Sequence, residues 1–313
     1  MKIFKPKFWN SKLNFFSIIL LPLSFLFKTA IFFKKIIIEE KKFKIPIICI
    51  GNIYLGGTGK TPLSIFLGNE LIKRKKEPVI IRKFYLNHKD EHDLIKGNFK
   101  NLLTHRKRVV ALSKAEEGKF DSVILDDGFQ DVRIKKDLNV LCFNQDHPIG
   151  NGYVLPAGPL REDLSAIKKT DIVVINGDKN IDFEEKLVKI NNKVSIYYSK
   201  YIPQNINDFK EKKLFVFAGI GNPENFFRLL EDNDLRIQKK FKFPDHYFFS
   251  KKELLNIIDE AKKNNCQVLT TEKDYYRIKD YKFDEIKYLK ISVHINNKEK
   301  LIDRILKVYD QDD

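Results

Sequence analysis

A glycine-rich segment early in the chain has the composition of a phosphate-binding loop. After the apolar run 46–50 the chain reads Tyr54-Leu55-Gly56-Gly57-Thr58-Gly59-Lys60-Thr61 and then enters a helical pattern at Pro62. Glycines let backbone N–H groups turn toward phosphate oxygens, a lysine neutralises the β and γ phosphates, and a threonine hydroxyl can hold Mg²⁺. The standard pattern begins with glycine, where this chain has Tyr54. We expect residues 54–61 to bind ATP; an ordinary glycine-rich turn is the alternative.

Two aspartates follow a second apolar run and could contribute to a magnesium site. Asp126 and Asp127 come directly after residues 122–125 and precede Gly128. A carboxylate at the carboxyl end of a buried strand beside a phosphate loop can reach the metal of a bound nucleotide. A strand-ending turn rich in Asp and Gly would be the plainer interpretation of a single aspartate. The pair favours Mg²⁺ binding by Thr61, Asp126 and Asp127.

The elements that must position these residues follow an α/β rhythm. Short apolar runs at 46–50, 79–82, 109–112, 122–125, 138–143 and 171–175 alternate with helical patterns, and the rhythm resumes with strands at 214–218 and 267–269 and helices at 223–231, 250–263 and 298–309. Continuous apolar strands separated by helices are typical of a parallel sheet covered on both faces. We predict an α/β fold: a P-loop NTPase-like parallel sheet with helices on both faces, plus a second, smaller α/β lobe.

The amino terminus has a different composition. No charge interrupts residues 13–27, which are flanked by lysines on both sides, with Trp9 just upstream. A helix of this length reaches roughly 22 Å, short of the roughly 30 Å hydrocarbon core. A membrane-associated helix lying in the interface, with Trp9 at the headgroups, is the prediction; a signal peptide or a buried first helix are the alternatives. The predicted domains are 1–35, 36–205 and 206–313.

Charge and cysteine content narrow the partners. The formal net charge of +16 comes mostly from lysines spread along the whole chain, without a recognisable nucleic-acid motif, so we expect no nucleic-acid partner. Cys49, Cys142 and Cys266 stand far apart inside apolar runs, which argues against disulfides or a zinc site. They are expected to be small core residues in a reducing compartment. Nothing in the sequence indicates an obligate protein partner.

Further motifs have compositions too specific for connecting loops. They are residues 150–162 (GNGYVLPAGPLRE), 217–223 (FAGIGNP), 243–246 (FPDH) and 270–274 (TTEKD). Together with the phosphate loop, Asp90-Glu91 and the DDGFQ string, this ordered set resembles the tetraacyldisaccharide 4'-kinase family of the lipid A pathway, from about residue 13 to the last helix. The resemblance implies transfer of the γ-phosphate of ATP to the 4'-hydroxyl of a tetraacyldisaccharide 1-phosphate, forming lipid IVA at the cytoplasmic face of the inner membrane.

The resemblance also implies site residues. Asp90 matches the family's catalytic aspartate, and His246 matches the histidine that assists it; with Lys60 they form the expected catalytic set. Arg161 and Glu162 match positions at the nucleotide and magnesium site. The family pattern has glycine before and proline after the Asp-Glu pair, where this chain has Lys89 and His92. A sugar hydroxyl does need a carboxylate to accept its proton.

Two rival functions share the phosphate loop. A membrane-binding ATPase of the deviant Walker class also has GGTGKT, but that class places a lysine directly before the two glycines, where this chain has Leu55. A nucleotide-binding membrane adaptor would not need the motifs at 150–162 or 243–246. Phosphate transfer to an acylated disaccharide discriminates among the three.

Overall fold

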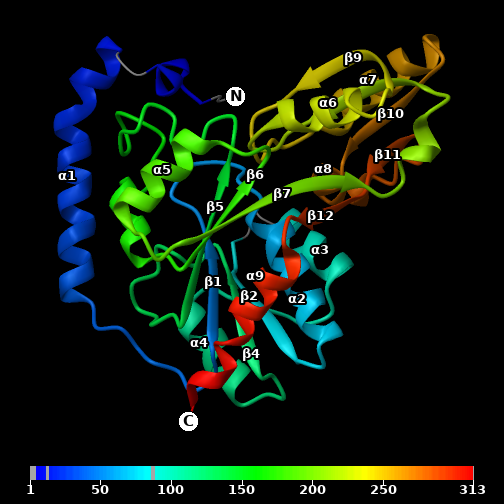
Figure 1. The fold of residues 1–313 in the computed structure, drawn as a ribbon. Helices are drawn as coiled ribbons and strands as arrows, with labels where there is room; N and C mark the ends of the chain where they lie inside the picture. Colours follow the sequence, from blue (N-terminus) through cyan, green and yellow to red (C-terminus); the bar gives the residue numbers. More distant parts are fainter. Residues whose placement is uncertain (1–4, 12–13, 86–88, 313) are drawn as a thin grey trace. The chain divides into compact units, whose positions relative to one another are not determined.

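The computed structural model describes residues 5–11, 14–85 and 89–312, which form two compact units (Figure 1). The larger unit contains 5–84, 99–200 and the segment from 294 onward. The smaller unit contains 85–98 and 201–293. The chain therefore contributes to the smaller unit at two separate places in the sequence. The domain boundaries predicted above, 1–35, 36–205 and 206–313, stay a prediction.

An eight-stranded sheet has the order β12-β7-β6-β5-β1-β4-β2-β3, and the neighbouring strands from β3 to β7 all run parallel. Its central strand β1 lies between β4 and β5, with Cys49 opposite both Leu125 and Asn139. The strands are β1 (Ile47–Gly51), β2 (Pro78–Lys83), β3 (Leu102–His105), β4 (Ser122–Asp126), β5 (Leu138–Asn144), β6 (Ile172–Asn176), β7 (Ser195–Pro203) and β12 (Ile291–Ile295).

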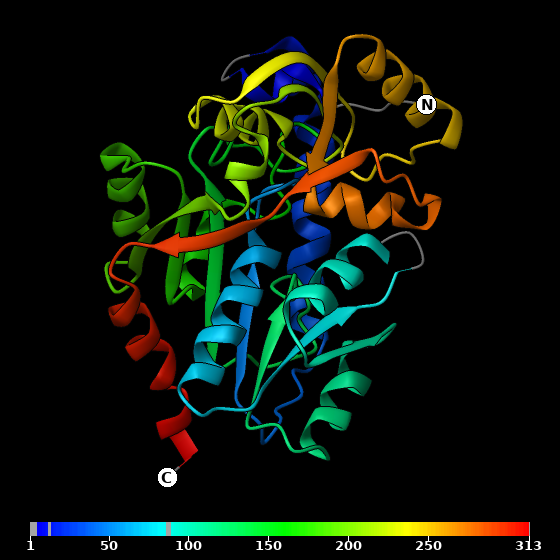
Figure 2. The ribbon, with the colours of Figure 1, turned by 90° about the vertical axis from the view of Figure 1, so that its right-hand side faces the viewer.

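Helices cover both faces of this sheet, as predicted. Helices α2 and α9 lie side by side (Figure 2), whereas α4 and α5 pack on separate apolar clusters. Successive side chains of a strand point to opposite faces of the sheet. Ile47 and Cys49 of β1, two residues apart, belong to the cluster under α4, so the residue between them points to the other face. The helices of this unit are α1 (Phe15–Ile37), α2 (Lys60–Lys73), α4 (Arg108–Glu116), α5 (Ile181–Ile190) and α9 (Lys298–Leu306).

The smaller unit has a four-stranded parallel sheet of order β11-β10-β8-β9. Phe217, Phe243 and Phe249 form its aromatic centre, with ring centroids 5.0 to 6.4 Å apart. Helix α3 packs on α8, although about 180 residues separate them in the chain. The elements are β8 (Lys213–Ala218), β9 (Arg236–Lys242), β10 (Cys266–Thr271), β11 (Ile286–Leu289), α3 (Lys89–Asn98), α6 (Pro223–Glu231), α7 (Lys251–Lys263) and α8 (Glu272–Ile278).

Helix α1 is longer than the predicted apolar run and has an unusual distribution of polar groups. Its 23 residues continue through Pro22 and Lys28, and by length and composition it could cross a membrane. Ser17, Ser24, Lys28 and Lys35 recur at spacings of seven and four, so they share one face. That face contacts the segment 151–163, whereas the other carries exposed side chains including Phe15, Phe16, Ile19, Phe25, Leu26, Phe32, Phe33 and Ile36.

Three expectations about individual segments are wrong. Residues 109–112 lie in α4 rather than in a strand, because Arg108, Ala111, Leu112 and Ala115 are buried at helical spacing. Trp9, expected at the lipid headgroups, is instead buried in the protein, and its indole Nε1 donates to the Pro156 carbonyl at 3.1 Å. Cys266 is half-buried at the start of β10, unlike the buried Cys49 and Cys142.

Candidate active site

The phosphate loop connects β1 to α2. Gly59 caps α2 with φ of +88°, a left-handed conformation that other residues adopt only at a cost. Asn52 is fully buried, and its side-chain amide donates to the Tyr54 carbonyl (2.6 Å), the Gly56 carbonyl (3.2 Å) and the Thr58 hydroxyl (3.0 Å). The Asn52 side chain therefore holds three positions of the loop, so that the backbone N–H groups of the loop are preorganised for a ligand.

The segment 150–162 runs beside this loop. The Leu55 amide donates to the Pro159 carbonyl at 2.8 Å, and the Arg161 amide donates to the Ile53 carbonyl at 2.6 Å. Between these bonds, Tyr54 forms a β-bridge with Leu160. A residue paired in this way needs no special backbone conformation, which explains why tyrosine can stand where the standard loop begins with glycine.

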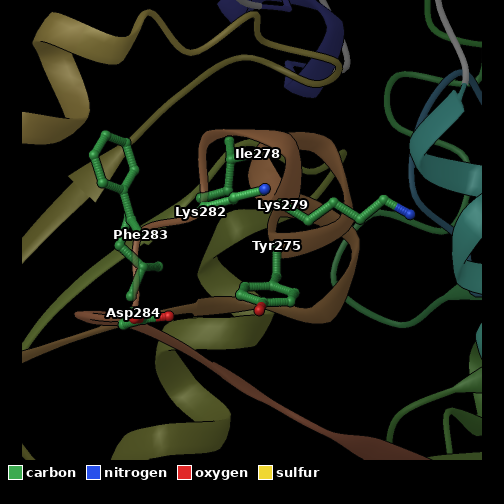
Figure 3. Close-up of a pocket in the computed structure, with 7 residues that line it drawn as sticks. Tyr275, Ile278, Lys279, Lys282, Phe283 and Asp284 are labelled. Atoms are coloured by element: carbon green, nitrogen blue, oxygen red, sulfur yellow. The ribbon is translucent and has the colours of Figure 1, made fainter.

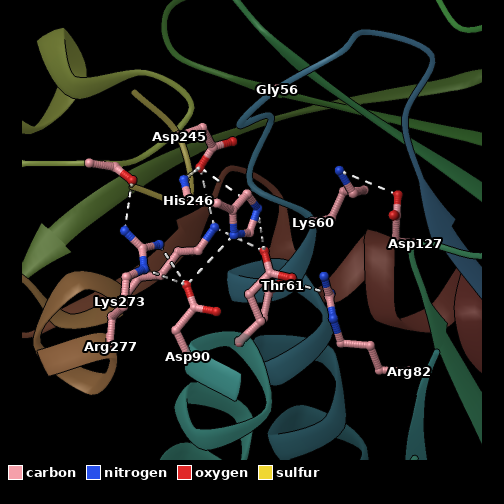
Figure 4. A network of polar contacts seen from close by, with 12 residues as sticks. Gly56, Lys60, Thr61, Arg82, Asp90, Asp127, Asp245, His246, Lys273 and Arg277 are labelled. Carbon is pink, nitrogen blue, oxygen red and sulfur yellow. Dashed lines mark hydrogen bonds and ion pairs between the residues drawn. The ribbon is translucent and has the colours of Figure 1, made fainter. Parts of the chain in front are cut away.

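Asp127 lies close to the cations around the phosphate loop. Its Oδ1 lies 3.5 Å from Lys60 Nζ (Figure 4). The same oxygen lies 3.1 Å from Arg161 Nη1, and the Asp127 carbonyl accepts from Arg108 Nη2 at 2.6 Å. Burial alone would raise the pKa of this carboxyl group, but Lys60, Arg161 and two further arginines lower the pKa to about 2. Its backbone is left-handed, with φ of +55°. Asp127 is thus an ionised group held against Lys60.

Asp126 faces the helix side of the loop and is fully buried. Its Oδ2 accepts from the Thr61 hydroxyl at 3.0 Å and also from Arg82, and its Oδ1 accepts from the Ser64 hydroxyl at 3.1 Å. Arg82 Nη1 additionally donates to Thr61 Oγ1 at 3.2 Å. Strand β4 and helix α2 thereby bring a carboxylate to the hydroxyl predicted to bind metal.

These oxygen donors suit Mg²⁺ chemically, because this ion binds one or two carboxylates, hydroxyls and phosphate oxygens rather than a full protein cage. Within the described ranges there is no group of three or more His, Cys, Asp or Glu that could hold a metal ion. Glu162, also expected at the metal, pairs with Lys35 of α1. Thr61 and Asp126 offer a hydroxyl and a carboxylate side by side, as this ion requires. The expected roles of Asp127 and Glu162 at the metal stay predictions.

A second polar cluster belongs to the smaller unit and contains Asp90. Its Oδ2 accepts from Arg277 Nη2 at 2.6 Å and from Nε at 3.2 Å, while its side chain is almost fully buried. His246 Nδ1 lies 3.8 Å from the same oxygen. The two residues that the family resemblance paired, Asp90 and His246, therefore lie together in this unit.

His246 has a further set of charged neighbours. Its Nε2 lies 3.8 Å from Glu91 and 3.9 Å from Asp245, and Lys273 Nζ lies 2.9 Å from Glu91 and 3.5 Å from Asp245. Burial would raise the pKa of Asp245, but Lys273 and His246 keep that pKa below its usual value. Burial would lower the pKa of Lys273, but the carboxylates Asp245, Glu91 and Asp90 raise it overall. Lys273 is thus held as a cation near His246.

Two hollows elsewhere contain none of the predicted residues. One, of about 30 Å³, is lined by Tyr275, Ile278, Lys279, Lys282, Phe283, Asp284 and Ile286 (Figure 3). The other, of about 460 Å³, lies in the larger unit beside Tyr197, Tyr198 and Lys200. The first is of the size of a few waters, and neither includes the phosphate loop.

Sequence reasoning missed several residues of both clusters. Asn52 directly follows β1, Arg82 lies near the end of β2, and Arg108 is the first residue of α4. Arg277 follows the TEKD string by three residues, one helical turn after Asp274, and this spacing could have indicated it.

Comparisons with known proteins concern nearly the whole chain. The family model described as Tetraacyldisaccharide-1-P 4'-kinase matches residues 16–310. A tetraacyldisaccharide 4'-kinase of Pelagibacter ubique is 42% identical over 98% of this chain and 99% of its own length. One from Rickettsia bellii is 32% identical over the same shares. The crystal structure of LpxK from Aquifex aeolicus in complex with ATP superposes with a TM-score of 0.70 at 24% identity, covering 94% of this chain and 99% of that one, and shares the fold.

Proposed function

Because the chain belongs to the tetraacyldisaccharide-1-P 4'-kinase family, we propose that it transfers the γ-phosphate of ATP to the 4'-hydroxyl of a tetraacyldisaccharide 1-phosphate, a step of lipid A biosynthesis that forms lipid IVA. The observation that carries this proposal is the span of the family match. Residues 16–310 include the phosphate loop, the Asp126-Asp127 pair, and the cluster of Asp90 and His246. The chain is accordingly an ATP-dependent kinase.

Phosphate binding falls to the residues of the loop. Residues 54–61 supply backbone N–H groups and the Lys60 ammonium, and Arg161 adds a second cation next to Asp127. Mg²⁺, when bound with ATP, neutralises charge on the phosphates, and Thr61 and Asp126 are the residues that would hold it. Lys60 must then exchange Asp127 for the nucleotide, since one ammonium cannot serve both fully.

Proton acceptance falls to Asp90. Its Oδ1 is buried and accepts no hydrogen bond within the described part of the chain. As the sugar oxygen attacks phosphorus, its proton passes to this carboxylate, and His246 shares or removes that proton. A buried acceptor with a vacant oxygen fits this role better than a surface ion pair does.

Membrane association is proposed from α1. An amphipathic helix on a globular protein normally turns its apolar face inward. In α1 the serine and lysine face contacts the protein and the aromatic face is exposed, with Phe25 at 70% and Ile37 at 77%. Such a surface is stable only in apolar surroundings. We place the enzyme at the cytoplasmic face of the inner membrane, where an acylated substrate would also be held.

The test is transfer of radiolabelled phosphate from ATP to an acylated disaccharide 1-phosphate in mixed micelles. Lys60→Ala should reduce turnover roughly 100-fold or more, because an electrostatic contact to the transferred group is lost. Lys73→Ala, at the far end of the same helix and paired with Glu70, is the matched control and should retain activity. ATP hydrolysis without transfer would favour the Walker-class ATPase, and nucleotide binding without turnover would favour the adaptor.

A further inference from the structure

Arg277 lies beside Asp90, the proposed base, and makes polar contacts through all three of its guanidinium nitrogens. Two of its nitrogens, Nη2 and Nε, donate to Asp90 Oδ2 at 2.6 and 3.2 Å. The third, Nη1, donates to Asp274 Oδ1 at 2.7 Å, to the Gly219 carbonyl at 3.1 Å and to the Tyr247 carbonyl at 3.3 Å (Figure 4). A planar guanidinium with all three nitrogens engaged has one orientation.

The contacts behind Arg277 are themselves fixed. Asp274 is fully buried, and its Oδ2 accepts from the Gly219 amide at 2.9 Å and the Thr271 hydroxyl at 2.7 Å. The Thr271 hydroxyl also caps α8 by accepting from the Asp274 amide. Arg277 is therefore attached through Asp274 to the start of α8 and to Gly219, which directly follows β8.

Two consequences for Asp90 follow. Its Oδ2 is occupied by Arg277, whereas Oδ1 accepts no hydrogen bond from any residue that the structure describes. In addition, the bond from Nη1 to Tyr247 fixes the backbone next to His246. One side chain thus connects both members of the proposed acid-base pair.

We propose that Arg277 is the positioning residue of this pair: it holds Oδ2 of Asp90 and the backbone beside His246, so that Oδ1 remains as the proton acceptor for the sugar hydroxyl. The inference rests on the proposed kinase function. Arg277 acts through Asp90 and does not touch the reacting atoms. Several charged groups surround Asp90 within the described part of this unit. They are Arg277 and Lys273 from α8, Asp274 behind Arg277, Glu91 on α3, and Asp245 and His246 from the loop between β9 and α7.

The experiment measures kcat, KM for ATP and the pH dependence of kcat in the full chain for Arg277→Gln and Arg277→Lys. Arg277→Gln should lower kcat roughly 10- to 100-fold, because a misplaced base loses much of its effect. KM for ATP should change less than about twofold, since the contacts of Arg277 described above belong to the smaller unit, whereas the residues proposed to bind ATP belong to the larger one. The acid limb of the profile should move to higher pH, because a cation next to the carboxylate has been removed.

Arg277→Lys retains the charge and loses the fork geometry. It should restore the position of the acid limb and only part of kcat. The matched control is Lys279→Met, which removes the 2.9 Å ion pair to Asp93 between α3 and the end of α8 without touching Asp90. Lys279→Met should keep kcat within about twofold.

The outcomes separate the possibilities. If Arg277→Gln loses activity only in proportion to its folded fraction, with an unchanged pH profile, the proposal is overturned and Arg277 is a structural ion pair. If Arg277→Gln does not fold, an Arg277→Lys variant with wild-type kcat overturns it equally. Absence of phosphate transfer by the unmodified chain would instead contradict the proposed function.

Discussion

Asp127 takes the contacts that a phosphate loop normally offers to its ligand. Lys60 and Arg161 both face its Oδ1, and its left-handed backbone holds the carboxylate there. Non-glycine residues in this conformation are concentrated at functional sites, where surrounding contacts offset the strain. Asp127 therefore offsets part of the charge of two partly buried cations. If ATP binds to this loop as proposed, it would compete with Asp127 for them.

This arrangement predicts a pH dependence of stability. The pKa of Asp127 falls from 3.8 to about 2 on folding, so its ionised form stabilises the fold above pH 4. The contribution, about 2 kcal/mol, is lost as the pH falls from about 4 to about 2. Urea unfolding at several pH values should therefore show a shallower acid decline for Asp127→Asn.

Other carboxylates titrate in the same range and serve as an internal control. The pKa values of Asp131 and Glu70 are also lowered to about 2, by arginine and lysine partners that outweigh burial. Both remain in the Asp127→Asn variant, so the difference between the two stability curves belongs to Asp127. Parallel curves for the two proteins would contradict the prediction.

The proposed acid-base pair predicts separable effects on chemistry and binding. Asp90→Asn should lower turnover strongly and leave ATP affinity unchanged, and His246 substitutions should cost less. The double variant should be no worse than Asp90→Asn, because residues acting as a unit are not additive. His246 has φ of +56°, so His246→Asn, which tolerates this conformation, tests the ring better than alanine. Wild-type turnover in Asp90→Asn, with loss in Asp126→Asn or Asp127→Asn, would show that the base lies elsewhere.

Residues of the site differ in how far the sequence predicts them. The phosphate loop is recognisable because its spacing is local. The contact of Arg277 with Asp90 joins positions 187 residues apart, and no local pattern encodes it. Asp90 and His246 came from family resemblance, and their catalytic roles stay predictions. Asn52 could not be singled out because its amide acts on backbone carbonyls.

At the scale of elements, most strands around β1 were predictable because they are continuous apolar runs between helical patterns. The strand prediction for residues 109–112 was wrong because four apolar residues fit either a strand or one face of a helix. Strand β9 was not predicted because it is not a continuous apolar run. Only two of its seven residues, Ile237 and Phe241, are apolar and partly buried, and the other five are exposed. The α/β fold class itself is confirmed.

Helix α1 gives a prediction about membrane binding. Deleting residues 1–33 should move the protein toward the soluble fraction, but this change also removes Ser24, which bonds to Val154 and Ala157. Replacing Phe25, Leu26, Phe32 and Phe33 with glutamine leaves those bonds intact. Co-sedimentation with anionic vesicles should fall roughly 10-fold or more, because four large apolar groups are lost, while ATP affinity stays unchanged.

The control for this experiment is Ser24→Ala, which alters the inward face alone. It should cost roughly 1 kcal/mol of unfolding free energy and leave vesicle binding unchanged. Unaltered co-sedimentation of the four-glutamine variant would mean that another surface attaches the protein to membranes.

At the scale of the whole molecule, the smaller unit is completed by a distant segment. Helix α3 supplies the buried Leu94 and Ile95, and Asn98 donates to Glu272 of α8 at 3.0 Å. A fragment of residues 201–293 should therefore unfold at lower urea concentration than the same fragment fused to 85–98 through a flexible linker. Circular dichroism measures both midpoints. Equal midpoints would indicate that α3 is dispensable for this unit.

The two-faced helix α1 also bears on how freely its sequence can be exchanged. A generic hydrophobic segment could replace a simple membrane anchor in a gene fusion, since only its length and hydrophobicity determine how it binds the bilayer. Here the serines at 17 and 24 are in register with Asn151, Val154 and Ala157, which precede Arg161 in the same segment. The helix and that segment are therefore expected to be inherited as a matched pair, and chimeras should respect both.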